Sequence, residues 1–206
     1  MSSLENKLRW CTTCLAMSTR NRITFDENGS CNACQWKNKK SSMNWEKRSN
    51  ELNTLLDRHR SIEGNFDCLV PCSGGKDGSY VAYNLKHQYN MNPLCLTVTP
   101  PLSLSLGDEN LKSFINSSYN HISINPHFES MRQINRAGFE KIGFPYFGWL
   151  TAIQSAPVRM ASKLGIGLIF YGEDGEVEYG GTDETLDKPI YDVEYMKKIY
   201  LEDGYD

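Results

Sequence analysis

The sequence predicts an α/β protein in which a parallel, twisted sheet carries helices on both faces, preceded by a small cysteine-rich module. Short apolar runs bounded by turn residues alternate with segments of helical periodicity along most of the chain. Strands of this continuously apolar kind are typical of a parallel sheet that is covered on both sides. Four cysteines in two close pairs precede that pattern. We therefore expect one module over residues 1–42 and a second domain over residues 43–206.

The apolar runs and helical patterns follow one another in a regular order. The expected strands lie at 66–70, 94–99, 121–124 and 165–171. The expected helices lie at 45–59, 77–89, 108–117, 127–142, 151–164 and 192–201. Asp108 is the expected N-cap of the third of these helices, Gly143 the expected end of the fourth, and Pro157 an expected break in the fifth. The basic segment 36–42 is expected to be a linker.

Composition excludes several classes of protein. The 206 residues carry a formal net charge of −3, which does not favour binding to nucleic acid through bulk electrostatics, although it leaves room for a local basic patch. No run approaches the roughly 18 apolar residues that a membrane span needs. The polar start, with Glu5, Lys7 and Arg9, is unlike a signal peptide. We expect a cytoplasmic protein without a membrane partner.

The four N-terminal cysteines have the spacing of a metal site. Cys11, Cys14, Cys31 and Cys34 form the pattern C-x2-C-x16-C-x2-C, and each pair can offer two sulfurs to one tetrahedral ion. A predicted strand at 22–25 and a turn around Asn28-Gly29 would fold the second pair back onto the first. We expect a zinc-ribbon-like module with zinc in a structural role, because four sulfurs leave no open position for catalysis. The alternative is a set of free thiols in a flexible arm.

A glycine-rich stretch follows the first predicted strand and opens the next helix. Such a strand–turn–helix arrangement binds phosphate, because backbone N–H groups and the helix dipole both point at the anion. The glycines allow close approach of the backbone, and hydroxyl and ammonium groups add further donors. The expected phosphate-binding residues are Ser73, Gly74, Gly75, Lys76, Asp77, Gly78 and Ser79.

The stretch is neither of two common nucleotide motifs. A Walker A loop needs glycine where Val70 stands, and the dinucleotide motif G-x-G-x-x-G does not match either. The stretch resembles the Ser-Gly-Gly-x-Asp-Ser loop of the ATP pyrophosphatases, called the PP-loop, whose members split ATP between the α and β phosphates. The match runs from Ser73 to Asp77 and departs at Gly78, where the family usually has Ser or Thr and where Ser79 follows instead.

The resemblance implies a PP-loop fold, of the adenine nucleotide alpha hydrolase-like kind, and a role for each loop residue. Ser73 and Ser79 would bind pyrophosphate oxygens, and Lys76 would add positive charge. Asp77 would hold Mg²⁺, or alternatively would only favour the helix N-terminus. ATP would lie with its adenosine beside Thr97 and Thr99.

Two families combine an N-terminal cysteine cluster with a PP-loop: the N-acetyl sugar amidotransferases of bacterial surface-polysaccharide synthesis and the tRNA thiolation enzymes. The chain looks more like the first, which includes enzymes of lipopolysaccharide O-antigen and nonulosonic acid biosynthesis. The cysteine cluster, residues 70–77, residues 171–173 and residues 178–181 follow the order of that family. Its members usually run longer than this chain, so a C-terminal part is either missing here or supplied otherwise.

That resemblance implies an ATP-dependent amidotransferase, a ligase that forms AMP and pyrophosphate. It would adenylate the N-acetyl carbonyl of a sugar or sugar nucleotide, and ammonia would then form an acetamidino group. The sequence has no convincing Cys–His–Glu triad for releasing ammonia, so a glutaminase and synthase-like subunits are the expected partners. Glu173 and Glu178 are expected to bind Mg²⁺, to orient ammonia or to accept its proton. Lys76 and Asp77 are the other expected catalytic residues.

Two alternatives stay open. A tRNA thiolation enzyme would need reactive cysteines near the ATP site, and Cys72, at the mouth of the loop, is the residue that keeps this alternative open. A non-catalytic nucleotide-binding subunit would account for Gly78 and the short chain.

Overall fold

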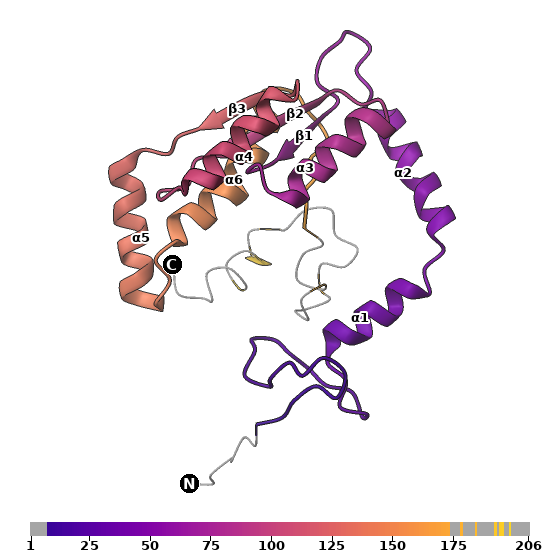
Figure 1. Ribbon diagram of the computed structural model, residues 1–206, viewed down its shortest axis with the longest axis vertical. Helices are drawn as coiled ribbons and strands as arrows, with labels where there is room; N and C mark the ends of the chain where they lie inside the picture. Colours follow the sequence, from indigo (N-terminus) through magenta and orange to yellow (C-terminus); the bar gives the residue numbers. More distant parts are fainter. Residues whose placement is uncertain are drawn as a thin grey trace. The chain divides into compact units, whose positions relative to one another are not determined.

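The computed structural model describes residues 8–173 together with residues 178, 184, 192, 194, 195 and 198. The chain forms two compact units, of which one comprises residues 46–173 and the other residues 1–45 and 174–206 (Figure 1). We call residues 46–173 the sheet domain and the described residues 8–45 the four-cysteine module. The predicted helix at 192–201 lies mostly outside the described residues.

The sheet domain is built on three parallel strands, β1 (Cys68–Pro71), β2 (Pro93–Val98) and β3 (Asn120–Ile124), in the order β1-β2-β3. Leu69 pairs with Leu94, and Leu96 pairs with Ile122. The three strands confirm the parallel arrangement that the sequence predicts. All six residues of β2 are buried, as expected for a strand covered on both faces.

The predicted fourth strand is reduced to a single parallel bridge on the free edge of β1. Leu69 donates its N–H to Leu168 (2.9 Å), and Phe170 donates to Leu69 (2.9 Å). Gly165 lies just before this segment with φ +68°, in the left-handed region, which ends the extended backbone on that side. The bridge nevertheless gives β1 a hydrogen-bonded neighbour on both edges.

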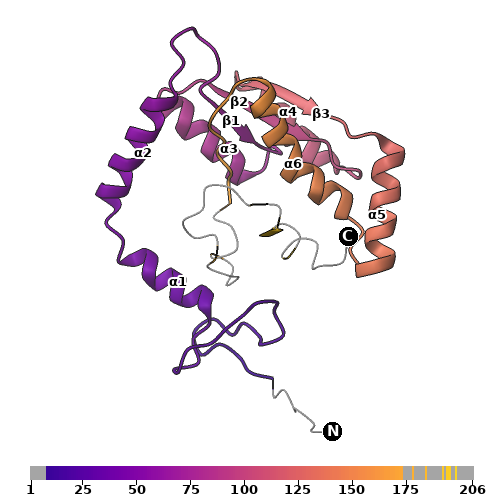
Figure 2. The ribbon, with the colours of Figure 1, turned by 180° about the vertical axis from the view of Figure 1, so that it is seen from behind.

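Five helices accompany the sheet: α2 (Trp45–His59), α3 (Lys76–Tyr83), α4 (Ser105–Asn116), α5 (Phe128–Ile142) and α6 (Phe147–Lys163). A short π-helical turn, η1 (Asn84–Gln88), continues α3. Val70 and Cys95 pack among side chains of α3, η1 and α4, whereas Leu69 and Leu96 pack against α6. The views from opposite sides show α4 and α6 on different faces of the sheet (Figures 1 and 2). The two-sided covering predicted from the apolar strands is therefore present.

Three helix predictions need correction. Helix α4 begins at Ser105 with Leu104 as its N-cap, so Asp108 lies in the first turn and is not the cap. Helix α6 begins at Phe147 and continues through Pro157 to Lys163. Pro157 is fully buried in a helix that packs on β1 and β2, and this burial compensates for the helical hydrogen bond that proline cannot make. No helix among the residues described here is long and apolar enough to cross a membrane.

Helices α5 and α6 pack through glycines at their contact. A Cβ on Gly138 would lie 2.5 Å from Cβ of Phe147 and 2.7 Å from the carbonyl oxygen of Phe144. Asn135 accepts a hydrogen bond from the N–H of Gly148 (2.7 Å), one of the uncapped donors at the start of α6. Gly143 ends α5 with φ +74°, as its position in the sequence predicts.

Gly138→Ala should destabilise the protein, because the new methyl group must push α5 away from α6. We expect a loss of about 1–3 kcal/mol in the free energy of unfolding, measured by urea denaturation. Gly107→Ala is the matched control, since Gly107 lies in α4 with nothing within 4 Å of its Cβ position. That change should stabilise the protein by up to about 1 kcal/mol. Equal effects of the two substitutions would contradict the packing described for Gly138.

Candidate functional site

The four N-terminal cysteines come together as the spacing predicts. Their Sγ atoms all lie within 4.8 Å of one another, with 3.9 Å between Cys11 and Cys34 and 3.6 Å between Cys14 and Cys31. A tetrahedral ion with Zn–S bonds of about 2.3 Å requires sulfurs about 3.8 Å apart. The cluster could therefore hold a metal ion such as zinc with four sulfur ligands.

The local backbone explains how the two pairs meet. Asp26 accepts hydrogen bonds from the N–H groups of Asn28 (3.0 Å) and Ser30 (2.8 Å), and Gly29 takes φ +76° at the tip of this turn. Phe25 then pairs with Cys31 in an antiparallel bridge. The predicted turn is present, but the predicted strand at 22–25 is reduced to this single bridge at Phe25.

Residues 36–42 are not the linker that the sequence suggested. They belong mostly to helix α1 (Asn32–Ser41), which starts after Cys31 and carries Cys34 in its first turn. The helix was missed because its side chains are polar on most faces and give a weak amphipathic pattern. Placing the second pair of cysteines at a helix start fixes the separation of their sulfurs.

The backbone of the module favours a negatively charged sulfur at Cys11. Burial acts to raise the pKa of this thiol, but the N–H groups of Cys14, Cys31 and Thr13 donate to its Sγ at 3.2–3.4 Å and lower the pKa to about 5. At Cys34 the effect of burial prevails, and it raises the pKa to about 12. Thiolate is the form in which cysteine binds a metal.

The second candidate site lies in the sheet domain, where β1 leads into α3. Cys72 continues the pairing with β2 by donating its N–H to Leu96 (2.9 Å). Gly74 then turns the chain with φ +78°, and Gly75 is the N-cap of α3 without a side-chain capping bond. The first N–H groups of α3 therefore lack a side-chain cap, which is the arrangement that phosphate-binding turns use.

Helix α4 lies directly against this turn. A Cβ on Gly74 would be 2.6 Å from both N and Cα of Leu111. No pattern in the sequence indicates this contact, because it depends on how α4 crosses the sheet. Residues 101–110, which precede the contact, are all exposed. Two independent constraints thus require glycine at position 74: the positive φ of the turn and the close approach of the α4 backbone.

The departure from the PP-loop pattern at Gly78 has a physical reason in this chain. A Cβ there would lie 3.0 Å from the Pro71 carbonyl oxygen and 3.0 Å from Cβ of Cys72, so α3 packs closely on the end of β1. The hydroxyl of Ser79, one of the expected phosphate ligands, is enclosed and has no hydrogen-bond partner among the described atoms. Ser73, by contrast, is exposed on the turn.

The two charged loop residues contact each other. Nζ of Lys76 lies 2.8 Å from Oδ1 and 3.0 Å from Oδ2 of Asp77, and both side chains are well exposed. An exposed pair of this kind contributes little to stability. Both groups are therefore accessible from solvent at the first turn of α3.

The chain that leaves the fourth-strand segment returns to the same turn. A Cβ on Gly172 would lie 2.8 Å from N of Gly78 and 3.0 Å from Cβ of Asp77. Glu173 follows at once and is exposed. The structure thus brings Glu173 into the neighbourhood of Asp77. Glu178 belongs to the other unit, in which it lies 3.6 Å from Nζ of Lys40.

The two threonines expected beside adenosine differ in environment. Thr97 is 4% exposed and donates its hydroxyl to the carbonyl of Cys72 (2.6 Å). Because that uses its single proton, His121 must donate through Nε2 in their 2.8 Å contact. Thr99 is exposed at the end of β2. Sequence reasoning missed the link between Thr97 and His121, since neighbouring parallel strands leave no local signal of their register.

Three thiols of the sheet domain lie in one apolar cluster, namely Cys68, Cys72 and Cys95. The side-chain contact with Cys95 lowers the pKa of Cys72, while the same contact and burial raise the pKa of Cys95. Cys72 is buried, with 8% of its surface exposed.

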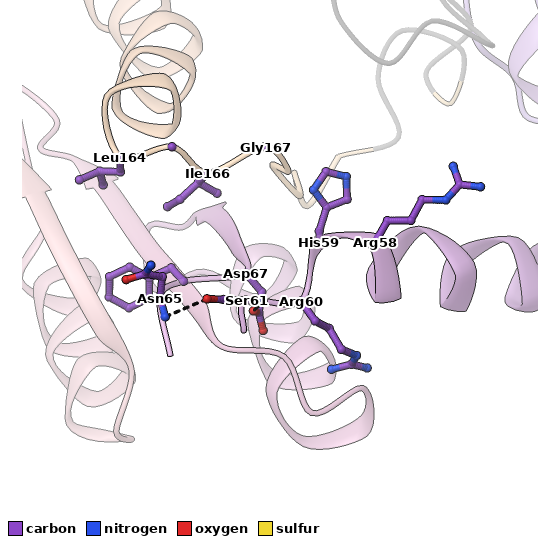
Figure 3. Close-up of a pocket in the computed structure, with 11 residues that line it drawn as sticks. Arg58, His59, Arg60, Ser61, Asn65, Asp67, Leu164, Ile166 and Gly167 are labelled. Atoms are coloured by element: carbon purple, nitrogen blue, oxygen red, sulfur yellow. Dashed lines mark hydrogen bonds between the residues drawn. The ribbon is translucent and has the colours of Figure 1, made fainter. Parts of the chain in front are cut away.

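A cavity of about 350 Å³ lies at the opposite, amino end of β1 (Figure 3). Asp67 lines it, but both of its oxygens already accept backbone N–H groups at 2.6 Å, from Ser61 and Asn92. His59 stands against Gly167 on the other side. Ligands of parallel α/β sheets bind at the carboxyl ends of the strands, so this cavity is not the candidate site.

Metal analysis should find about one zinc ion per chain in the purified protein. Cys31→Ala should remove most of that zinc, because three sulfurs bind it less tightly, and should unfold the four-cysteine module. Cys68→Ala is the matched control, as it removes another fully buried thiol, in the sheet domain. Inductively coupled plasma mass spectrometry gives the zinc content of each variant. Equal zinc in both variants would show that the cluster does not bind the ion.

Gly74→Ala should cost more stability than Gly143→Ala. Both positions have positive φ, +78° and +74°, but only Gly74 has another backbone against its Cβ position. The shared backbone strain is about 1–2 kcal/mol, and the clash with α4 should add roughly 1–3 kcal/mol at Gly74 alone. Thermal unfolding of the two variants measures the difference. A difference near zero would mean that α4 does not press on the turn.

The chain is similar in sequence to part of another protein, but it matches no known family. No protein-family model matches the chain. It is 30% identical over 89 residues to "Uncharacterized protein MJ1599" of Methanocaldococcus jannaschii. The match covers 43% of this chain and 32% of that relative, so the chain matches about a third of the relative's length.

Proposed function

We propose that this chain is an ATP-dependent amidotransferase that adenylates the N-acetyl carbonyl of a sugar and replaces its oxygen with ammonia-derived nitrogen. One observation carries the proposal: the Ser73–Gly75 turn joins the carboxyl end of a buried parallel strand to a helix N-terminus without a side-chain cap. That geometry suits a polyphosphate. The PP-loop resemblance of the same residues supplies the choice of ATP and of adenylation.

The acetamido group explains why ATP is needed. Its carbonyl is a poor electrophile, and the carbonyl oxygen would attack the α-phosphorus of ATP, releasing pyrophosphate. Ammonia would then add to the activated carbon and lose a proton, and AMP would leave with the former carbonyl oxygen. The product is an acetamidino sugar.

The chain's own groups have distinct tasks in this scheme. The turn N–H groups and Lys76 would bind the pyrophosphate oxygens, and Asp77 would hold the Mg²⁺ that offsets their charge. Glu173, which follows the glycine packed on Asp77, would accept a proton from the attacking ammonia. The Ser79 hydroxyl is enclosed, so Ser73 would supply the hydroxyl of the loop.

The four-cysteine cluster has a structural task in this proposal. Its four sulfurs would fill the coordination sphere of zinc, so the ion would organise the module and leave no position for substrate. Ammonia would come from a partner glutaminase, because at neutral pH bulk water holds mostly ammonium, which lacks the lone pair that attacks the carbon, and only a small fraction of free ammonia.

Asp77→Asn should abolish pyrophosphate release from ATP in the presence of an N-acetylated sugar nucleotide and ammonium. The amide keeps the size of the side chain but loses the charge that would hold Mg²⁺. Asp108→Asn is the control, because Asp108 is also an exposed aspartate in the first turn of a helix. If Asp77 serves only the helix dipole, both variants should lose about 0.3–1 kcal/mol of stability and both should stay active.

Mass spectrometry of the sugar gives the second readout. Replacement of O by NH lowers the mass by about 1 Da, which follows from atomic masses. Pyrophosphate release that requires tRNA and not sugar would favour the thiolation reading. ATP binding without turnover in either assay would make the chain a nucleotide-binding subunit.

A further inference from the structure

Positive charge is concentrated in the N-terminal part of the chain. Residues 1–45 contain seven Lys or Arg and three Asp or Glu residues, a formal charge of +4 in a chain whose net charge is −3. A zinc ion bound to four thiolates would carry a charge of −2, so the metal-loaded module would still be positive. The excess of positive charge is therefore confined to the N-terminal part, and the net charge of the whole chain does not reveal it.

The backbone of two arginines adjoins the bridge that holds an exposed aromatic residue on the four-cysteine module. Trp10 pairs with Met17 in an antiparallel bridge. On one side of it, Arg9 donates its N–H to Oγ of Ser18 (3.0 Å) and accepts from the N–H of Ser18 (2.9 Å). On the other, the N–H of Arg20 donates to the carbonyl of Met17 (3.1 Å). We call Arg9, Trp10, Met17 and Arg20 the knuckle ridge.

The ridge is open to solvent. Trp10 is 54% exposed and Met17 is 40% exposed, and both arginines are exposed as well. The guanidinium of Arg9 lies 5.4 Å from the centroid of the Phe25 ring, a contact that orients this side chain without neutralising its charge. The carboxylate of Asp26 is engaged in its own turn with Asn28 and Ser30.

We propose that the knuckle ridge binds single-stranded nucleic acid, with Arg9 and Arg20 on phosphates and a base stacked on Trp10. Cationic groups alternating with an aromatic face match the alternation of phosphate and base along a single strand. An acidic protein surface would also attract the arginines, but it would gain little from the flat face of Trp10. This inference goes beyond the proposed enzymatic function and does not depend on it.

The test is fluorescence anisotropy with the zinc-loaded, full-length chain. The probes are fluorescein-labelled oligouridylate and oligothymidylate of about 12 nucleotides, a length within the site sizes of single-strand binding proteins, and labelled poly-L-glutamate. We expect both oligonucleotides to bind, with an affinity that falls between 50 mM and 200 mM salt by a log–log slope of about −0.7 per phosphate contact. The preferred oligonucleotide identifies RNA or DNA as the ligand.

Two substitutions separate stacking from charge. Trp10→Ala should weaken oligonucleotide binding at least about 5-fold, which corresponds to the lower end of stacking energies of 1–3 kcal/mol per base. Arg20→Ala should reduce the steepness of the salt dependence by about 0.7. Neither should change zinc content, because neither residue is a cysteine ligand.

Trp45→Ala provides the matched control for Trp10, because Trp45 is 58% exposed and lies at the start of α2, outside the ridge. It should leave binding unchanged. Three results would overturn the proposal: no oligonucleotide binding at low salt, equal losses from Trp10→Ala and Trp45→Ala, or poly-L-glutamate binding as tight as that of the oligonucleotides. The last result would indicate an acidic protein as the partner of the ridge.

Discussion

Hydrogen bonding on both edges of β1 is the constraint on which the sheet domain depends. Leu69 pairs with β2 on one side and with residues 168–170 on the other. Because all these segments run parallel, the chain leaves each of them at the same end of the sheet. The turn after β1 and the turn after residue 171 are therefore neighbours, and Gly172 comes to lie on the first turn of α3. Residues almost a hundred positions apart thus share one site.

The sequence predicted the parts of this arrangement that depend on local chemistry. Strands buried on both faces are continuously apolar, so β1 and β2 were recognisable. The end of α5 at Gly143 follows from the freedom of glycine to adopt positive φ. The meeting of four cysteines follows from their spacing and from the turn at Gly29, and only the separation of the sulfurs had to come from the structure.

Predictions failed where tertiary contacts override local pattern. Helix α1 has too weak a polar–apolar contrast to be seen, yet it positions Cys34. Pro157 was expected to interrupt a helix, but packing against the sheet keeps α6 continuous. At the turn after β1, the sequence indicated the glycine turn and the helix start but not the environments of the side chains. Thr97 faces inward to Cys72, and the hydroxyl of Ser79 is enclosed, which no spacing rule could indicate.

Close backbone approach leaves no room for a side chain at two positions around the turn, Gly74 and Gly172, and very little at a third, Gly78. Gly74, Gly78 and Gly172 would each place a Cβ at or within 3.0 Å of another part of the chain. Proteins that diverge from this one can exchange apolar core residues for others of similar volume, but not these glycines without moving α3, α4 or the segment after residue 171. Retention of glycine at all three positions is therefore a packing signature, and it can trace common descent among longer proteins even where overall identity has decayed.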